Sequence, residues 1–254
     1  MTDLSGRTAV VTGATSGIGA AIALHVGAAG ARVYVSGRDA DRGAAVVASI
    51  VDAGGQAEFF AADVTRDDDV ADLARVAASE GSIDYWFSNA GVEGPIGSMA
   101  GWTAGALREV IDANLTSVLS GMRHASAHMR RGGAIVNTAS FVGTVVPVSI
   151  AVPYAAAKAG VVAAGRSAAL LLADVGIDVF TLCPWVIDTP MVERLAGESA
   201  DAKADFAAGF APSGRLTSVD DVARVAVELL TDKPRRASGT ALLVDAGPTV
   251  AVLD

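Results

Sequence analysis

The fold is decided near the N-terminus by the stretch TAVVTGATSGIG, residues 8–19. Its first five residues form a nearly continuous apolar run, as in strands that are covered by helices on both faces. A glycine-rich turn follows, and a helical pattern begins at Ile18. Glycines at such a turn let the backbone approach a pyrophosphate, and the N-terminus of the following helix offers free N–H groups to that anion. The stretch therefore predicts a strand, a nucleotide-binding turn and a helix.

The same alternation continues along the chain. Strands are predicted over Thr8–Thr12, Arg32–Ser36, Ala57–Ala61, Ile83–Ser88, Ala134–Thr138, Asp178–Leu182 and Ala241–Val244. Helices are predicted over Ile18–Ala29, Ala40–Ala53, Asp67–Ser79, Thr103–Arg131, Pro153–Asp174 and Val219–Leu230. Repeated strand–helix–strand units favour right-handed crossovers and one doubly wound α/β domain around a parallel sheet. We expect a single domain, residues 1–254, in which residues 189–214 depart from the rhythm and form either a flap over the site or a peripheral helix pair.

The composition of the chain argues against several classes of binding partner. The chain has 254 residues, with 28 Asp and Glu against 19 Lys and Arg, and a net charge of -9. This acidic balance argues against nucleic acid and anionic membranes, which require clustered basic residues. The lone cysteine, Cys183, excludes an internal disulfide and suits a reducing compartment. We see no uncharged apolar run of the ~20 residues that a membrane span needs and no signal peptide, and we expect a cytoplasmic protein.

The end of the second predicted strand bears on cofactor choice. In a dinucleotide-binding unit, a carboxylate at this place binds the ribose 2′-hydroxyl of NAD. Here the chain reads Ser36-Gly37-Arg38, and a guanidinium matches a 2′-phosphate bidentately. NADP(H) is therefore favoured. NAD(H) stays possible, because the neighbouring Asp39 offsets part of the positive charge of Arg38.

Tyr154 and Lys158 are four residues apart near the start of a predicted helix, so both side chains project from one face. Pro153 fits the first turn of that helix. A lysine ammonium ~4 Å from the phenol would favour the phenolate by about 4 kcal/mol at an effective dielectric of 20. This pairing predicts a tyrosine whose pKa is lowered toward the range in which it can act as an acid or base.

Other polar residues follow strands of the same predicted sheet. Ser140 follows the fifth strand, and Asn89-Ala90-Gly91 follows the fourth. In doubly wound folds, ligands bind at this carboxyl edge. Asn114 lies in the next helical stretch.

Taken together and in this order, these motifs resemble those of the short-chain dehydrogenase/reductase family, over essentially the whole chain. The resemblance implies a Rossmann-type, seven-stranded parallel sheet of order 3-2-1-4-5-6-7, and commonly a homotetramer, with a homodimer as the alternative. It also implies roles for the residues. Tyr154 would exchange the proton with the substrate oxygen, Ser140 would hold that oxygen, Lys158 would bind the nicotinamide ribose, and Asn114 would hold a water in a proton relay. The implied cofactor-binding residues are Gly13, Thr15, Ser16, Gly17, Ile18, Gly19, Arg38, Asp63, Val64, Asn89, Ala90, Gly91, Tyr154, Lys158, Pro184, Ile187 and Thr189, with Asp63 at the adenine and Ile187 and Thr189 at the carboxamide.

Two departures from the family pattern concern the pocket. Ser140 and Tyr154 are fourteen residues apart, one more than is usual in the family. Trp185 follows Pro184 where the family commonly has glycine. The expected pocket wall is mostly apolar, and it consists of Phe141, Val142, Val146, Val148, Trp185 and Met191, with residues 93–96 on the opposite loop. Such a wall favours a small hydrophobic ketone or secondary alcohol.

Two alternatives remain. A 3-oxoacyl-carrier reductase of the same family would need basic residues for its acidic carrier, and Arg130, Arg131 and Arg166 keep that possibility open. A nucleotide-sensing protein without turnover is the other alternative, although such relatives typically lack the tyrosine or the lysine that this chain retains. His124 and His128 are four apart, but cationic neighbours oppose a dication, so we expect no metal site.

Overall fold

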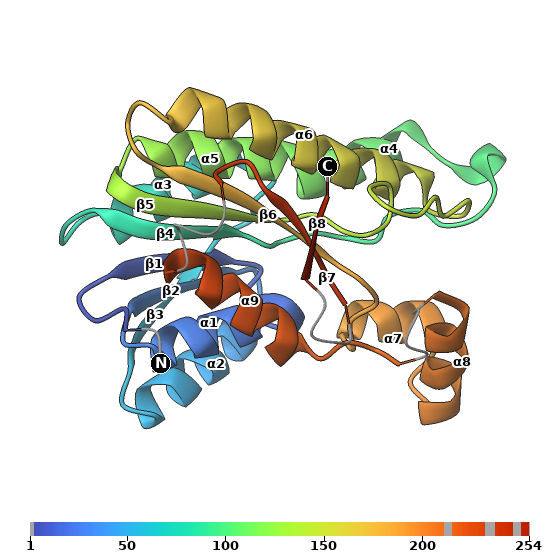
Figure 1. Ribbon diagram of the computed structural model, residues 1–254. Helices are drawn as coiled ribbons and strands as arrows, with labels where there is room; N and C mark the ends of the chain where they lie inside the picture. The colour runs from blue at the N-terminus through green and yellow to red at the C-terminus, as the bar shows by residue number, and fades with distance from the viewer. Residues whose placement is uncertain (1–2, 211–214, 232–236, 246–249, 254) are drawn as a thin grey trace.

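One twisted sheet organises the molecule (Figure 1). The computed structural model describes residues 3–210, 215–231, 237–245 and 250–253. In sheet order the strands are β3 (Gln56–Ala61), β2 (Arg32–Gly37), β1 (Thr8–Thr12), β4 (Ile83–Ser88), β5 (Met129–Thr138), β6 (Asp178–Pro184), β7 (Ala241–Val244) and β8 (Val250–Leu253). The first seven are parallel, which confirms the predicted order. The edge strand β8 was not predicted, and it pairs antiparallel with β7.

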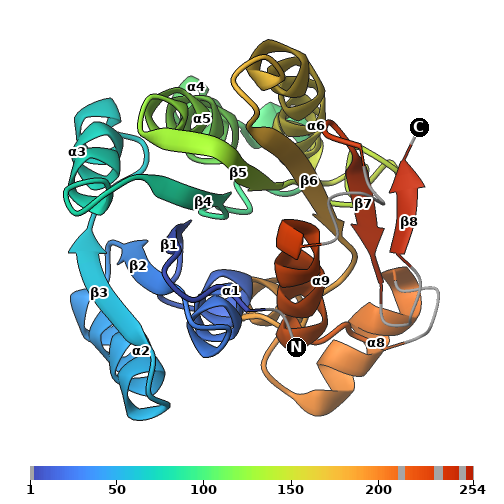
Figure 2. The ribbon, with the colours of Figure 1, turned by 60° about the vertical axis from the view of Figure 1, so that its left-hand side comes forward.

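Helices cover both faces of this sheet (Figures 1 and 2). One layer contains α1 (Gly17–Ala28), α2 (Ala40–Asp52) and α9 (Val219–Thr231), and the other contains α3 (Asp67–Ala77), α5 (Ser117–Ser126) and α6 (Val152–Leu172). Strand β4 shows how one strand contributes side chains to the cores on both faces of the sheet. Tyr85 and Phe87 pack into the core beside α1 and α9, whereas Trp86 packs into the core beside α3 and α5. Alternate strand side chains point to opposite faces, so a continuous apolar run fills two cores.

The prediction of one helix over Thr103–Arg131 was wrong. The chain instead forms α4 (Ala104–Ile111), a π-helical turn (Asp112–Thr116) and α5, and Met129–Arg131 already belongs to β5. The sheet extends there because Met129 pairs with Ile83 and because the Arg130 guanidinium binds the buried carboxylate of Asp84. These are tertiary contacts, which a local helical pattern does not contain.

The segment after β6 forms two helices, α7 (Pro190–Ala196) and α8 (Ala200–Phe210), which lie apart from the two layers (Figure 1). Residues 211–214 of the predicted flap lie outside the described residues. Lys203 of α8 joins the two helices, because its ammonium donates to Asp188 and to Glu193, both at 2.8 Å. The segment is therefore a helix pair tied together by charge.

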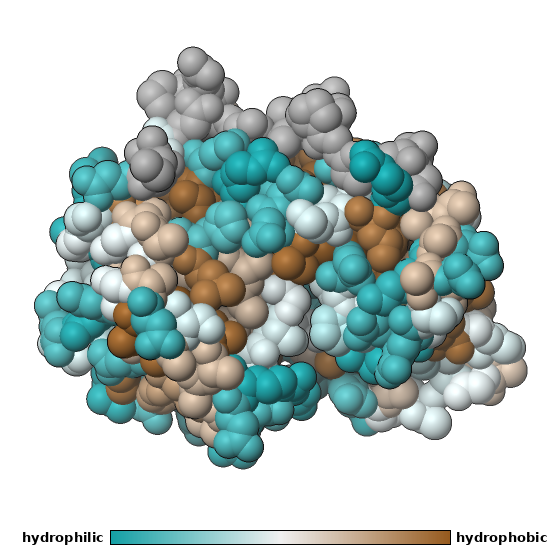
Figure 3. Space-filling view, turned by 90° about the horizontal axis from the view of Figure 1, so that it is seen from below, coloured by the Kyte–Doolittle hydropathy of each residue, from teal (hydrophilic) through white to brown (hydrophobic). Residues whose placement is uncertain are grey.

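Helix α6 is the one helix among the described residues that is long and apolar enough to cross a membrane by length and composition. Its contacts with β5 and β6 and its two charged residues, Lys158 and Arg166, are those of a helix packed on the sheet. The surface over α1, α2 and α9, seen from below in Figure 3, mixes hydrophilic and hydrophobic residues.

Candidate active site

A cavity of about 940 Å³ opens at the carboxyl ends of the parallel strands. Its lining contains the sequence-predicted catalytic, cofactor and substrate residues except Gly19, Gly94, Pro95 and Val146. Gly19 lies beneath the turn, where a Cβ atom would come within 2.3 Å of the Gly13 carbonyl oxygen. The cavity therefore runs without interruption from the glycine turn to the predicted catalytic residues.

The glycine turn is shaped by close packing. Gly13 has a φ of +64°, and a Cβ atom there would lie 2.7 Å from the Cα atom of Ala90. Gly17 opens α1 with a φ of +53°. The N-cap residue Ser16 makes no side-chain hydrogen bond to the helix. Since the first N–H groups of a helix lack intrahelical partners, this end of α1 is suited to a pyrophosphate.

The next strand end, β2, leads to two basic side chains that line the cavity, Arg38 and Arg42. Asp39 caps α2 by accepting the Arg42 backbone N–H at 3.0 Å, and it also accepts the Arg42 Nε–H at 2.7 Å. Asp39 is thus paired with Arg42, and the Arg38 guanidinium has no hydrogen bond or ion pair with any described residue. Arg42 was missed by sequence reasoning, although its position four residues after Arg38, in the first turn of α2, was the available signal.

Asp63 follows β3 and lines the same end of the cavity. One carboxylate oxygen accepts hydrogen bonds from the backbone N–H and the hydroxyl of Thr65, at 3.0 and 2.8 Å. The Thr65 hydrogen bonds hold the pKa of Asp63 below its usual value, with a smaller contribution from the Arg38 charge. Asp63 is therefore an ionised acceptor with one oxygen left to face the cavity, next to Val64.

Asn114 sits in the π-helical turn and is fully buried. Its amide nitrogen donates to the carbonyl oxygens of Val92 and Val110, both at 2.9 Å, and its side-chain oxygen accepts the Val92 N–H at 3.2 Å. The side chain thereby fixes the loop that follows Gly91. These bonds use both amide protons, so the predicted water relay stays a prediction.

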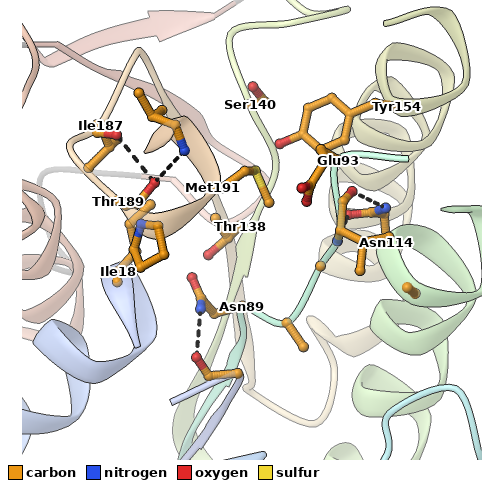
Figure 4. Close-up of a pocket in the computed structure, with 18 of the residues that line it drawn as sticks. Ile18, Asn89, Glu93, Asn114, Thr138, Ser140, Tyr154, Ile187, Thr189 and Met191 are labelled. Carbon is orange, nitrogen blue, oxygen red and sulfur yellow. Dashed lines mark hydrogen bonds between the residues drawn. The ribbon is translucent and has the colours of Figure 1, made fainter. Parts of the chain in front are cut away.

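Tyr154, Ser140 and Lys158 meet at the centre of the site. In Figure 4 the Tyr154 ring directs its hydroxyl toward the segment that carries Ser140, and an interaction with Ser140 contributes to the pKa of Tyr154. Lys158, one turn further along α6, is 3% exposed, and its Nζ atom lies 5.6 Å from the centroid of the Tyr154 ring. That ammonium donates to the Thr138 carbonyl oxygen at 2.8 Å. The structure therefore brings together the three predicted groups from β5 and α6.

The predicted lowering of the tyrosine pKa is not found in the structure. Burial raises the pKa of Tyr154 to about 12; interaction with Ser140 opposes the rise, and the Glu93 charge adds to it. Burial also lowers the pKa of Lys158 to about 8. The prediction from sequence counted the attraction between a lysine and a phenolate, but it contained no cost for taking either charge out of water.

The substrate end of the cavity has an aromatic wall. Phe141 and Trp185 stack with their ring centroids 4.6 Å apart and their planes 19° apart, and Val148 and Met191 line the cavity as well. The main chain at Trp185 is fixed by its backbone N–H, which donates to the Val244 carbonyl oxygen at 2.8 Å. Trp185 thus contributes to the pocket wall, as expected.

The segment between Ser140 and Tyr154 begins with a compact turn. The Phe141 carbonyl oxygen accepts the backbone N–H groups of Thr144, Val145 and Val146, at 2.9–3.2 Å. Gly143 has a φ of +78°, and a Cβ atom there would come within 2.3 Å of the Ala155 carbonyl oxygen. The turn therefore packs tightly on the start of α6.

The residues after β6 complete the cavity. Thr189 caps α7, accepting the Val192 N–H at 3.5 Å and donating to the Ile187 carbonyl oxygen at 3.3 Å (Figure 4). A Cβ atom on Gly17 would lie 3.3 Å from the Thr189 methyl group, so α7 begins against the glycine turn. Pro184, at the end of β6, lines the cavity, whereas Cys183 before it is fully buried, as expected, and burial raises the pKa of its thiol to about 11.

One ion pair of the site was missed by sequence reasoning. Arg194 of α7 binds Glu93 of the loop after β4 through two hydrogen bonds, from Nε at 2.6 Å and from a terminal nitrogen at 3.0 Å. Both residues line the cavity. They are 101 positions apart, so no local pattern could have paired them.

The chain is similar to known proteins over most of its length. Residues 13–249 match a family model described as enoyl-(acyl carrier protein) reductase. The chain is 42% identical over 247 residues to a cis-4-hydroxycyclohexanecarboxylate dehydrogenase of Sinomonas cyclohexanicum, covering 96% of each chain. It is 37% identical over 258 residues to 3beta-hydroxysteroid dehydrogenase 1 of Eggerthella lenta, covering 98% of this chain and 95% of the other.

A solved structure shares the fold. A short chain dehydrogenase from Burkholderia cenocepacia, crystallised in complex with NADP, superposes with a TM-score of 0.87 and 32% sequence identity. The match covers 96% of this chain and 98% of that one.

Proposed function

The chain belongs to the short-chain dehydrogenase/reductase family, and from this premise we propose that it transfers a hydride between a nicotinamide cofactor and a hydrophobic ketone or secondary alcohol. The observation that carries the proposal is that Tyr154 and Ser140 lie near each other (Figure 4), with Lys158 beside the Tyr154 ring, in a cavity continuous with the glycine turn.

The chemistry follows from these groups. A bound nicotinamide cofactor supplies or accepts the hydride. Ser140 donates a hydrogen bond to the substrate oxygen, and Tyr154 gives its phenolic proton to that oxygen when a ketone is reduced. In the opposite direction the Tyr154 phenolate takes the alcohol proton. A phenol with a pKa of about 12 is protonated at neutral pH and is ready to act as the acid.

Lys158 opposes the negative charge that develops on Tyr154. Its ammonium is buried and anchored to the Thr138 carbonyl oxygen, so its position is fixed before the reaction. A fixed charge in a site of low dielectric stabilises a neighbouring anion more strongly than the same charge does in water. Lys158 would also hold the nicotinamide ribose.

The cofactor proposed is NADP(H). Arg38 and Arg42 both line the nucleotide end, and Asp39, the carboxylate that could oppose a phosphate there, is paired with Arg42. The uncapped N-terminus of α1 would hold the pyrophosphate, and Asp63 would accept a hydrogen bond from the adenine. Binding of NADP by the Burkholderia relative is in keeping with this choice.

We propose a cyclic secondary alcohol, or the matching ketone, as the substrate. The flat face of the Phe141–Trp185 stack suits an alicyclic ring. The relatives named above carry ring alcohols in their names, a hydroxycyclohexanecarboxylate and a hydroxysteroid. Residues 189–214 would act as the flap over this ring, since Met191 and Phe206 line the cavity from α7 and α8.

A carrier-bound substrate is the second candidate, because the matching family model is described by such an activity. The arginines that kept it open do not face the cavity. Arg130 and Arg131 lie at the amino end of β5, whereas Ser140 follows its carboxyl end. Arg130 binds Asp84, Arg131 donates to the Asp174 carbonyl oxygen, and Arg166 donates to the Leu253 carbonyl oxygen. Their placement favours the small substrate.

The test is turnover with a panel of cyclic and acyclic ketones plus NADPH, and of the matching alcohols plus NADP⁺, followed by absorbance of the reduced cofactor. Tyr154→Phe should lower kcat by roughly 10²- to 10⁴-fold while cofactor affinity holds. Tyr85→Phe, at a buried tyrosine outside the cavity, is the matched control. A wild-type chain that binds NADPH and turns over nothing in the panel would favour the nucleotide-sensing alternative.

A further inference from the structure

The Glu93–Arg194 pair joins two parts of the site that are otherwise separate. Glu93 belongs to the loop after β4, which Asn114 fixes through Val92. Arg194 belongs to α7, which begins at the glycine turn. Two nitrogens of the Arg194 guanidinium each donate a hydrogen bond to a different oxygen of the Glu93 carboxylate. Such bidentate pairs are geometrically specific as well as strong. The pair therefore connects the fixed loop to the predicted flap.

The carboxylate of this pair faces the reacting group. Figure 4 shows Glu93 beside the Tyr154 ring in the cavity. The Glu93 side chain is 24% exposed, against 56% for Arg194, so the acid lies deeper in the site than its partner. The charge of Glu93 contributes to the raised pKa of Tyr154, and the hydrogen bonds from Arg194 hold the pKa of Glu93 below its usual value. An ionised carboxylate thus stands near a phenol that must lose its proton during alcohol oxidation.

Resting on the function proposed above, we propose that Arg194 is a positioning residue for the reaction: its grip on Glu93 holds helix α7 across the substrate pocket and neutralises a carboxylate that faces Tyr154. Without the guanidinium, Glu93 would present an unpaired negative charge to the phenolate, and like charges disfavour ionisation. The other charged or titratable groups on the elements around this site include Lys158 and Arg166 of α6, Arg108 and Glu109 of α4, Cys183 of β6, and Glu193 with its partner Lys203 on the helix pair.

The test is a double-mutant cycle read through pH. The rising limb of kcat/KM for oxidation of a cyclic alcohol is measured for wild type, Arg194→Met, Glu93→Gln and the double variant. Arg194→Met should move the limb to higher pH by about half a unit or more, because the phenolate then faces an unpaired carboxylate. Glu93→Gln should move it to lower pH. In the double variant the effect of Arg194→Met should vanish, since the carboxylate on which it acts is gone.

Two further variants separate charge from geometry. Arg194→Lys keeps the positive charge but cannot make the two parallel hydrogen bonds of a guanidinium. The rising limb of kcat/KM should therefore lie close to its wild-type pH, whereas the α7 amides should still exchange faster than in the wild type. Arg75→Met removes an exposed arginine that pairs with Asp72 on α3 and is the matched control, with a wild-type pH limb. Hydrogen exchange of the α7 amides gives a readout that needs no turnover, and it should quicken in both Arg194→Met and Glu93→Gln.

Three results would overturn the inference. One is an Arg194→Met enzyme that turns over with an unmoved pH limb. The second is a double variant in which Arg194→Met shifts the pH limb as far in the Glu93→Gln enzyme as it does in the wild type. The third is α7 exchange that is unchanged in both single variants. The proposed function fails differently: wild type would turn over no alcohol, or Tyr154→Phe would retain its activity, and the α7 exchange comparison would still decide whether the pair holds the helix.

Discussion

The Thr12 hydroxyl, at the carboxyl end of β1, accepts a hydrogen bond from the backbone N–H of Asn89, at the end of β4, over 3.0 Å. The same hydroxyl donates to the Phe87 carbonyl oxygen at 3.2 Å and lies 3.4 Å from the Ala90 nitrogen, which also donates to it. Thr12 is 5% exposed. One buried hydroxyl therefore joins the glycine turn to the Asn89-Ala90-Gly91 segment, the two strand ends between which a dinucleotide would lie.

Thr12→Val tests this link, because valine keeps the shape of threonine and removes the hydroxyl. Two backbone N–H groups then lose their acceptor. We expect the free energy of unfolding to fall by about 1–3 kcal/mol, measured by urea denaturation, with weaker NADPH binding. Thr12→Ser retains the hydroxyl and should stay closer to wild type. Equal stability of Thr12→Val and wild type would show that water replaces the hydroxyl at no cost.

Cofactor choice is tested at Arg38 and Arg42. Arg38→Asp should weaken NADPH binding by at least about tenfold, because a charge-assisted hydrogen bond is worth about 1.5–3 kcal/mol and the new carboxylate would repel a phosphate. NADH affinity should hold or improve. Arg42→Ala should weaken NADPH binding less, since this arginine also pairs with Asp39.

Fluorescence titration with both cofactors measures these affinities. Arg75→Asp, remote from the cavity, controls for the change in net charge. An equal loss of NADPH and NADH affinity in Arg38→Asp would contradict the assignment of NADP(H).

The aromatic wall is tested by Trp185→Gly, which restores the residue that is common in the family. Loss of the indole removes the stack with Phe141 and should destabilise the fold by about 1 kcal/mol or more. The pocket widens, so kcat/KM should rise for bulky ring ketones relative to cyclohexanone. Trp185→Phe keeps a ring against Phe141 and should preserve the wild-type preference. A substrate profile that is the same in all three enzymes would place the indole outside the substrate's reach.

Lys158 predicts a pH-dependent stability. Its pKa is lowered from 10.5 to about 8 by burial, so between these two values the unfolded chain binds more protons than the folded one. Stability then rises with pH in that window. Below pH 8 the folded state carries the full cost of the buried ammonium, on the order of 3 kcal/mol for a shift of this size.

Lys158→Met removes the charge and is the comparison. The wild type should gain stability relative to Lys158→Met as the pH rises from about 8 toward 10, measured by urea denaturation at several pH values. Tyr154 acts in the opposite sense only above pH 10, where its raised pKa makes the folded state bind more protons. A stability difference that does not change between pH 7 and 10 would show that the ammonium is solvated in the folded state.

Several elements could be predicted from local pattern alone. The apolar runs Ile83–Ser88 and Thr8–Thr12 were predicted with the bounds that the structure has, because a short, continuous apolar run is typical of a strand that is buried on both faces. The three aspartates in the first turn of α3 and the Ser218 hydroxyl that accepts the Asp221 N–H are likewise local signals of a helix start. Each of these signals is contained within a few residues.

Features that depend on distant partners were not predictable. The helical pattern of residues 103–131 continued into β5, and only the pairing of Met129 with Ile83 and the binding of Arg130 to Asp84 end it. The edge strand β8 needs β7 as its template. Arg42 and Arg194 carried no motif, and their place in the cavity depends on where α2 and α7 pack.

The sequence by itself determined the alternation of strands and helices, the glycine turn and the presence of Ser140, Tyr154 and Lys158 at one sheet edge, because periodicity, glycine spacing and a four-residue helical interval are local properties. The order of the strands followed from the resemblance to the family. Only the tertiary structure decided the electrostatics of that edge. Burial moves the pKa of Tyr154 up and that of Lys158 down, and the Glu93–Arg194 pair brings together charges 101 positions apart. Desolvation and long-range ion pairing depend on the packed surroundings of a group, which residue order alone does not show.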